Sequence, residues 1–283
     1  MTALARARMV RDWAGPTVVA ALGLALYWPG LRIMVGGWIS NDNASHGFLI
    51  APVAAFLAWQ RRRQFRAQPA AIYRPALAAV AGALGLYLLA RYAEIEFLSA
   101  VSFLVLVGGL LWYLFGPARM RVWAFPYLFL WFMIPWPDLL VEFLSFPLQL
   151  WAARAAAAVI RLLGMSIMRE GVDLHIAGYS FAVAAPCSGM RSLVALMALA
   201  ALLAYLCRGP LWRRLTLFAL GLPMALVANA VRVVVVLLVG ARFGPESAES
   251  FLHTTSGLVV FLVAVGGLYG LARLLRLRPL GAH

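Results

Sequence analysis

The chain has 283 residues, of which 64% are hydrophobic and 12% charged, with a formal net charge of +14 at pH 7. Soluble globular domains have about 45–50% apolar and about 25% charged residues, and disordered chains are more polar still. These values exclude both classes and predict an all-α polytopic membrane protein. Because a spanning helix takes about 20 apolar residues, we expect one membrane domain, 1–283, and little else.

Long apolar runs predict about eight transmembrane helices, because each is close to the length that crosses a bilayer. In chain order they cover residues 14–35, 46–60, 75–91, 97–116, 122–136, 188–207, 215–239 and 253–272. Basic residues precede the first run, as in a signal peptide, but no small-residue cleavage site follows it. We therefore expect an uncleaved first span.

Two further segments lie between the fifth and sixth runs. The segment 137–165 is apolar, but prolines interrupt it and it carries charged residues such as Asp138 and Arg154. We expect an amphipathic or re-entrant helix at the membrane face, with a ninth span as the alternative. In the segment 164–187, apolar and polar side chains alternate with a period of about two, which predicts a short β-hairpin on the outer face.

The charges are distributed unevenly along the chain, and all 24 basic residues are Arg. With a cytoplasmic N-terminus and eight spans, the inner segments hold 16 of the 24 arginines but only one of the 10 acids. This positive-inside pattern predicts that both termini are cytoplasmic. It also attributes the net charge to contact with anionic membrane lipids, so no nucleic-acid partner is expected.

The chain has two cysteines, Cys187 and Cys207. They lie at opposite ends of one predicted span and would be roughly 30 Å apart, which is too far for a disulfide. Cys207, beside Arg208 at the inner face, is interpreted as a small buried residue or a residue that can be palmitoylated. Cys187 lies near a helix N-terminus at the outer face, where the helix dipole lowers the pKa of a thiol, and Arg191 follows one turn later.

Arg232 interrupts the apolar run 224–240. An arginine inside the membrane is costly and marks a functional site, with a side chain that snorkels to the interface as the alternative. Asn229 precedes it by three residues and therefore shares its helix face. His253 opens the last predicted span. Cys187, Arg232 and His253 thus fall at the outer level of three consecutive spans, which we expect to be neighbours.

These three side chains fit cysteine acyl transfer. A thiolate nucleophile needs a proton acceptor, which His253 supplies near neutral pH. The tetrahedral oxyanion needs positive charge or hydrogen-bond donors, which Arg232 supplies.

The sequence resembles the exosortase/archaeosortase family in four motifs that occur in the family's order. They are SHGF at 45–48, PCSGMRSL at 186–193, NAVR at 229–232 and HTTSG at 253–257. The resemblance implies a membrane-embedded cysteine peptidase or transpeptidase of the bacterial cytoplasmic (inner) membrane, with its catalytic half at about 165–272. It also implies Cys187 as the nucleophile, with Arg232 and His253 as the other catalytic residues.

The resemblance further implies a substrate class. Exported proteins would carry a C-terminal sorting signal of the PEP-CTERM type, which consists of a Pro-Glu-Pro motif, a transmembrane helix and a basic cytoplasmic tail. The enzyme would cut near the motif at the outer, periplasmic face and pass the protein to a surface acceptor, with a lipid, a glycan and a peptide all left open. Some members carry an additional C-terminal domain tied to exopolysaccharide assembly, for which we expect this protein to need a separate partner.

Supporting roles are expected for other residues of these motifs, namely Asn229, Ser188 and Arg191. His46 lies in the SHGF motif, and a structural role and a substrate-binding role are both left open for it. His46, His175 and His253 would share the outer side, but their spacing does not indicate a zinc site. No metal and no cofactor are expected.

Three other functions are alternatives to the transpeptidase. In a transporter component, Arg232 would line a substrate cavity and Cys187 would be incidental. In a haem protein, two outer histidines would be axial ligands. A purely hydrolytic intramembrane protease would use the same catalytic residues, with water in place of the acceptor.

Overall fold

The computed structural model describes residues 3–41, 44–176, 179–183, 190–254 and 256–279. Within these ranges it describes the backbone alone for residues 3–17, 19–20, 179, 190–192, 252–254, 256 and 279. The chain divides into two compact units, Met1–Pro135 and Trp136–His283. Each unit is taken by itself below.

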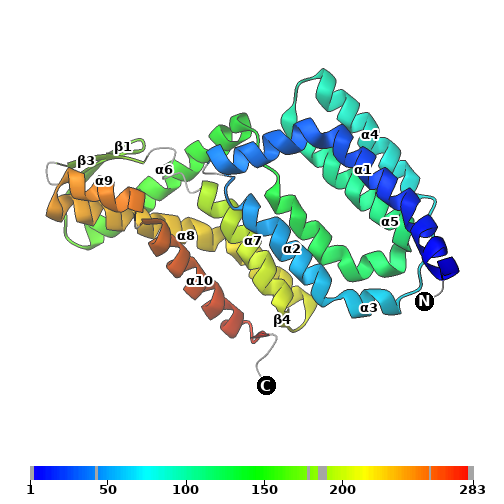
Figure 1. Cartoon of the computed structure of the whole chain (residues 1–283). Coiled ribbons are helices and arrows are strands. Elements are labelled where there is room, and N and C mark those ends of the chain that lie inside the picture. Colours follow the sequence, from blue (N-terminus) through cyan, green and yellow to red (C-terminus); the bar gives the residue numbers. More distant parts are fainter. Residues whose placement is uncertain (1–2, 42–43, 177–178, 184–189, 255, 280–283) are drawn as a thin grey trace. The chain divides into compact units, whose positions relative to one another are not determined.

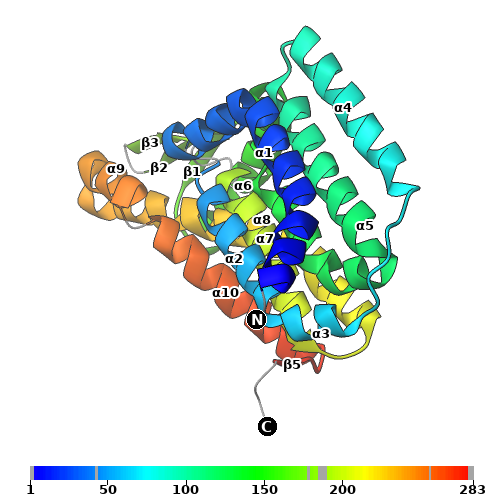
Figure 2. The same cartoon turned by 45° about the vertical axis from the view of Figure 1, so that its right-hand side comes forward.

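All secondary-structure elements in the described part of the first unit are helices (Figure 1). Its elements are α1 (Ala3–Ser40), α2 (Gly47–Gln60), α3 (Arg62–Ala67), α4 (Ala76–Tyr92), α5 (Glu96–Phe129) and the 3₁₀ helix η1 (Leu130–Met133). Helices α4 and α5 lie side by side (Figures 1 and 2). Tyr27 of α1 hydrogen-bonds Ser102 of α5 at 2.7 Å, which satisfies two polar groups that would be costly in an apolar interior.

Helix α5 is sharply bent at Gly116, whose φ of 74° lies in a region that favours glycine. The Tyr127 hydroxyl donates to the Leu104 carbonyl at 2.9 Å, although 23 residues separate them. In a straight helix those residues would be about 35 Å apart. The second arm of α5 therefore folds back along the first, so the predicted spans 97–116 and 122–136 correspond to two separate arms.

The second unit combines helices with two small sheets. Its elements are α6 (Asp138–Leu162), β1 (Ile167–Glu170), β2 (Asp173–Ile176), β3 (Tyr179–Ala182), α7 (Met190–Leu206), β4 (Cys207–Arg208), α8 (Leu211–Phe243), α9 (Pro245–Thr254), α10 (Ser256–Leu274) and β5 (Arg278–Pro279). Helix α8 is its central element, since α6, α7, α9 and α10 all pack against it.

The predicted hairpin is confirmed as β2 and β3, and a third antiparallel strand, β1, extends it. Leu174 pairs with Phe181 in the register, and both side chains are buried in a core shared with α6 and α8. On the other face, His175 Nδ1 hydrogen-bonds Ser180 at 2.8 Å. The alternation of apolar and polar side chains in the sequence thus separates the face of β2 and β3 that packs into the core from the face that points away from it. Strand β1 lacks that clear alternation and was not predicted.

Segment 137–165 contains one continuous helix, α6 (Asp138–Leu162), in which Pro147 lies without a break in the backbone. This differs from the re-entrant form of the expected helix, because a re-entrant segment has to reverse direction, whereas the amphipathic helix and the alternative of a ninth span both stay open. Its 25 residues give a length of about 37 Å.

Four helices in the described part are long and apolar enough to cross a membrane: Glu96–Met133, Asp138–Leu162, Leu211–Phe243 and Gly257–Leu274. Three shorter apolar helices are Gly47–Gln60, Ala76–Tyr92 and Leu193–Leu206. Together they support a polytopic membrane protein, while the count of eight spans stays a prediction.

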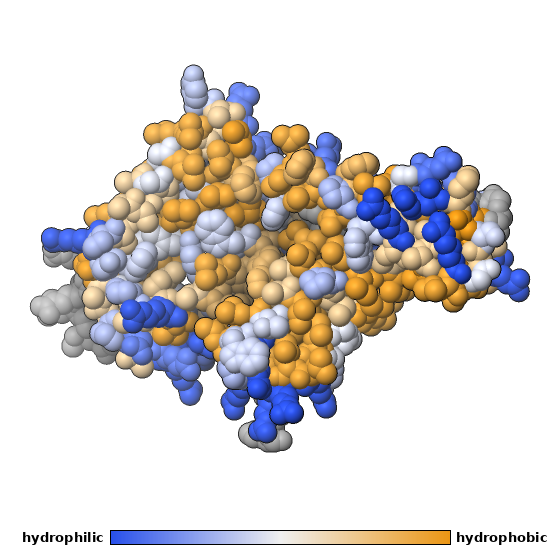
Figure 3. All heavy atoms as spheres, turned by 180° about the vertical axis from the view of Figure 1, so that it is seen from behind, coloured by the Kyte–Doolittle hydropathy of each residue, from blue (hydrophilic) through white to orange (hydrophobic). Residues whose placement is uncertain are grey.

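Large apolar side chains point outward on many helices. On α6, Leu139, Phe143 and Leu162 are 81%, 74% and 87% exposed. Figure 3 shows hydrophobic residues over much of the face in view, with hydrophilic residues gathered in separate groups. Exposed apolar surface on this scale is far larger than water-soluble proteins carry, and it matches a lipid surrounding.

Candidate active site

Arg232 and Asn229 form a buried polar pair on α8. Their side chains are 7% and 2% exposed, and Arg232 Nη2 donates to Asn229 Oδ1 at 2.8 Å. The contact follows from helix geometry, because residues three apart project from the same face. Burial within the protein argues against the alternative in which Arg232 snorkels along a lipid-facing surface.

Helices α7, α8 and α10 pack together as a three-helix group. Two core clusters fix their register. The first joins Leu196 of α7, Ala228 of α8 and Val260 of α10. Compared with the first cluster, the second contains later residues of α7 and α10 but earlier residues of α8. Helices α7 and α10 therefore run antiparallel to α8.

This register shows which parts of the three helices lie level with Arg232. Arg232 is four residues beyond Ala228, about 6 Å along α8. The first residue of α10, Ser256, is four residues before Val260, also about 6 Å. The first residue of α7, Met190, is six residues before Leu196, about 9 Å. The N-terminal ends of α7 and α10 and the Arg232–Asn229 pair therefore share one end of the three-helix group, which we call the site end.

Several predicted site residues lie outside the described part of the structure. Cys187 and Ser188 fall in the segment 184–189. The backbone of Arg191 is in the first turn of α7 and that of His253 is in the last turn of α9, but their side chains are not described. Of the predicted site, the structure therefore brings Arg232 and Asn229 together and leaves Cys187 and His253 as predictions.

The position of His253 differs from the sequence interpretation in one respect. It does not open the last long helix, since α10 begins at Ser256 and His253 belongs to the separate helix α9. Gly244, with a φ of 92°, ends α8, and α9 then turns so that Ala248 enters the core beside α8. A ten-residue helix with two exposed acids lacks the apolar run that identified the other helices, so the sequence merged its end with α10.

His46 has a clear structural setting in the first unit. Its Nε2 hydrogen-bonds the Phe132 carbonyl at 3.0 Å, and Trp38 Nε1 donates to the neighbouring Met133 carbonyl at 2.9 Å. Carbonyls at a helix end have no partner within the helix, so these two side chains satisfy the end of η1. Of the two open roles for His46, the structural one has direct support.

Gly47 and Phe48 of the SHGF motif belong to the same cluster. A Cβ on Gly47 would collide with the indole of Trp38. Phe48 meets that indole edge-on, with ring centroids 5.4 Å apart. Sequence reasoning missed this role of Trp38, whose partners in η1 lie 95 residues away along the chain.

Cys207 is buried, with 4% exposure, at the opposite end of the three-helix group from Arg232. It follows the last residue of α7, and β4 pairs it with Pro279 of β5. Burial raises the pKa of the Cys207 thiol, and the nearby positive charge of Arg214 opposes that rise only in part. The thiol is therefore protonated at neutral pH, and the interpretation of Cys207 as a buried structural residue is confirmed.

Comparison with known proteins gives one result. The family model described as transmembrane exosortase matches residues 38–270, a range that contains all four motifs and the whole three-helix group apart from its last turns. Among curated proteins and among solved structures, no match is found. The match covers most of the chain, and the protein therefore belongs to the transmembrane exosortase family.

Proposed function

We propose that this protein is a membrane-embedded cysteine transpeptidase that removes the C-terminal sorting signal of exported proteins and transfers them to an acceptor at the cell surface. The observation that carries the proposal is the buried Arg232–Asn229 pair at the site end of the three-helix group. The family match supports it independently. A buried cation is costly in an apolar helix, and stabilisation of an oxyanion would account for the presence of Arg232 there.

The electrostatics suit this role. Helices α7, α8 and α10 contain no Asp or Glu, so the three-helix group itself offers Arg232 no carboxylate. Arg232 donates a hydrogen bond to the neutral side-chain amide of Asn229. A neutral acceptor helps to fix the orientation of the guanidinium and does not itself cancel the positive charge. In a dry environment such preorganised charge stabilises an oxyanion strongly.

The proposed reaction has two halves. His253 takes the proton of the Cys187 thiol, and the thiolate attacks the scissile carbonyl, whose oxygen gains negative charge beside Arg232. A C–S bond forms, the C–N bond breaks, and His253 returns the proton to the leaving amine. An acceptor nucleophile then attacks the thioester carbonyl while His253 takes its proton. The bond from the acceptor to the carbonyl carbon forms, the C–S bond breaks, and His253 returns the proton to the Cys187 thiolate. Exclusion of water from the site favours transfer over hydrolysis.

The proposed orientation follows from the charges. The start of α8 and the end of α10 carry Arg213, Arg214 and Arg273, which belong on the cytoplasmic side of the inner membrane. The site end then lies at the periplasmic face. A sorting signal with a basic cytoplasmic tail would cross the membrane beside the enzyme and present its motif at that level.

Co-expression with a tagged substrate tests the proposal. The substrate is an exported protein that ends in a Pro-Glu-Pro motif, an apolar helix and an arginine tail, and its processing is followed by gel mobility and intact mass. Wild type and Cys207→Ala are expected to remove the C-terminal helix, while Cys187→Ala and Arg232→Ala are not. Processing by Cys187→Ala would show that Cys187 is not the nucleophile. The mass of the mature C-terminus separates transfer from hydrolysis.

A further inference from the structure

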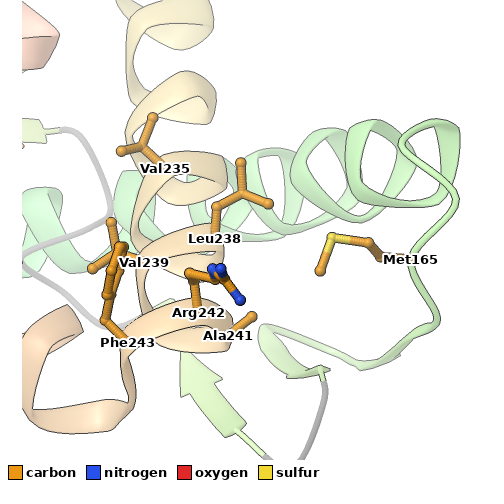
Figure 4. A pocket seen from close by; sticks show the side chains of 7 residues that line it. All are labelled: Met165, Val235, Leu238, Val239, Ala241, Arg242 and Phe243. Atoms are coloured by element: carbon orange, nitrogen blue, oxygen red, sulfur yellow. The ribbon is translucent and has the colours of Figure 1, made fainter.

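An open pocket of about 450 Å³ lies in the second unit at the C-terminal end of α8. Figure 4 shows the α8 side chains that line it and Met165, which reaches it from the segment after α6. Its walls are almost wholly apolar and include Val235, Leu238, Val239 and Phe243. Among the described residues that line it, Arg242 is the one with a charge.

The pocket continues the face of α8 that carries Arg232. Val235 and Val239 follow Arg232 by three and seven residues, the spacing of one helix face. Arg242 follows Val239 by three residues and extends the same stripe. A ligand that lies along this stripe would therefore end beside the turn of α8 that carries the buried Arg232–Asn229 pair.

In the proposed orientation, the pocket lies just outside the hydrocarbon layer of the membrane, where a peptide segment can reach it. An upright α8 that enters the hydrocarbon layer after Arg214 crosses its thickness of about 30 Å in about 20 residues. The outer boundary then falls near Val235, with Arg232 about 5 Å below it and the pocket above it. A chain segment outside the hydrocarbon, but next to the site, would enter this pocket.

The charge of Arg242 is not explained by orientation. Arginines that orient a membrane protein lie on the cytoplasmic side, whereas Arg242 is at the opposite end of α8 from Arg213 and Arg214. Its side chain is exposed, and within the described residues no hydrogen bond or ion pair engages it. A guanidinium set among apolar walls selects a ligand with a carboxylate between apolar groups.

We propose that this pocket binds the motif of the sorting signal, with Arg242 paired to the motif glutamate and the apolar walls in contact with the prolines on either side. This inference rests on the proposed function. The dimensions agree, since three extended residues span about 10 Å and Val235 to Arg242 also spans about 10 Å along α8. Arg242 is thus assigned as a specificity residue, distinct from the catalytic Arg232.

A charge exchange tests the assignment. Arg242→Glu is expected to process the Glu-motif substrate at least about tenfold more slowly than wild type, because two like charges would face each other. The same variant is expected to process a substrate with arginine in place of the motif glutamate faster than wild type does. Rates are measured by pulse labelling in the co-expression system, and thermal unfolding of the purified variants checks folding.

Arg161→Glu is the matched control. Arg161 is exposed and lies in the last turn of α6, as Arg242 lies in the last turn of α8, so both changes disturb a helix dipole equally. Arg161 does not line the pocket, and its variant is expected to process both substrates like wild type.

The outcomes are separable from failure of the proposed function. If wild type shows no Cys187-dependent processing, the proposed function fails. If wild type processes the substrate and Arg242→Glu does so equally well, the pocket assignment alone is wrong. Equal slowing of both substrates by Arg242→Glu would also overturn it, because a site for an anionic lipid headgroup, unlike a motif site, is insensitive to the sign of the substrate's charge.

Discussion

At the residue scale, the pair of Arg232 and Asn229 was predictable because it depends only on helix periodicity. Any helix over 229–232 places residues three apart on one face, and the structure adds the 2.8 Å hydrogen bond and the burial. The setting of His46 was not predictable, since its carbonyl partner lies 86 residues away. The spacing of residues along one helix determines which side chains are neighbours, whereas a contact between distant segments depends on the whole fold.

The neutrality of Asn229 leads to a prediction. Asn229→Asp would create an ion pair with Arg232 in a buried place and cancel the charge offered to the oxyanion. We expect folding to be kept and processing to fall about 100- to 1000-fold, the range found for the loss of one oxyanion donor. The measurements are processing rate and thermal unfolding. Asn229→Ala, which removes the acceptor without adding charge, is the control and should process better than Asn229→Asp; the reverse order would contradict the charge argument.

The raised pKa of Cys207 gives a second prediction at this scale. In the Cys187→Ala variant, Cys207 is the only thiol. Because its pKa is raised above the ordinary value, reactive thiolate forms only at a higher pH than for an exposed cysteine. Alkylation by iodoacetamide, followed by intact mass, should be slow at neutral pH, rise in alkaline buffer, and become fast after denaturation in detergent. Rapid alkylation of the folded protein at neutral pH would show that Cys207 is neither buried nor protonated.

At the element scale, close approach at glycine holds the start of α2 against the end of α1. Gly47→Ala would place a methyl group against the Trp38 indole and displace the donor that satisfies Met133. We expect a loss of about 1–3 kcal/mol in the free energy of unfolding, the usual cost of overpacking. Thermal or denaturant unfolding in micelles measures it.

Gly82→Ala in α4 is the control for Gly47→Ala. A Cβ there meets nothing within 4 Å, and alanine favours a helix over glycine. Its stability should stay the same or increase. If both variants are equally stable, the Trp38 cluster is not tightly packed and the explanation of the SHGF motif fails.

Elements were predicted to different degrees for physical reasons. Apolar runs and alternation are properties of one segment, so the long helices and the β2–β3 hairpin were recognisable. The pairing of β4 with β5 joins Cys207 to Pro279. Strands of two residues are too short to show a sequence pattern that would predict this pairing. Helix α9 is short and amphipathic, so its identity depends on packing beside α8.

At the scale of the whole molecule, charge and geometry together constrain the path through the membrane. If the N-terminus is cytoplasmic and Arg208, Arg213 and Arg214 are cytoplasmic too, exactly one of the second arm of α5 and helix α6 crosses the bilayer. The Tyr127–Leu104 hydrogen bond shows that the second arm returns along the first for about 15 Å. We therefore expect the second arm of α5 to cross the bilayer. Helix α6, although long enough to span, should have both ends at the periplasmic face.

Labelling of single cysteines tests this path. In a Cys187→Ala, Cys207→Ala background, Leu139→Cys and Leu162→Cys place thiols at the two ends of α6, where both native side chains are more than 80% exposed. A membrane-impermeant maleimide added to intact spheroplasts should label both. Leu211→Cys, at the start of α8 beside the cytoplasmic arginines, should react only after the membrane is permeabilised. Labelling of Leu139→Cys without Leu162→Cys would show that α6 crosses, and the positive-inside assignment of the three-helix group would then be inverted.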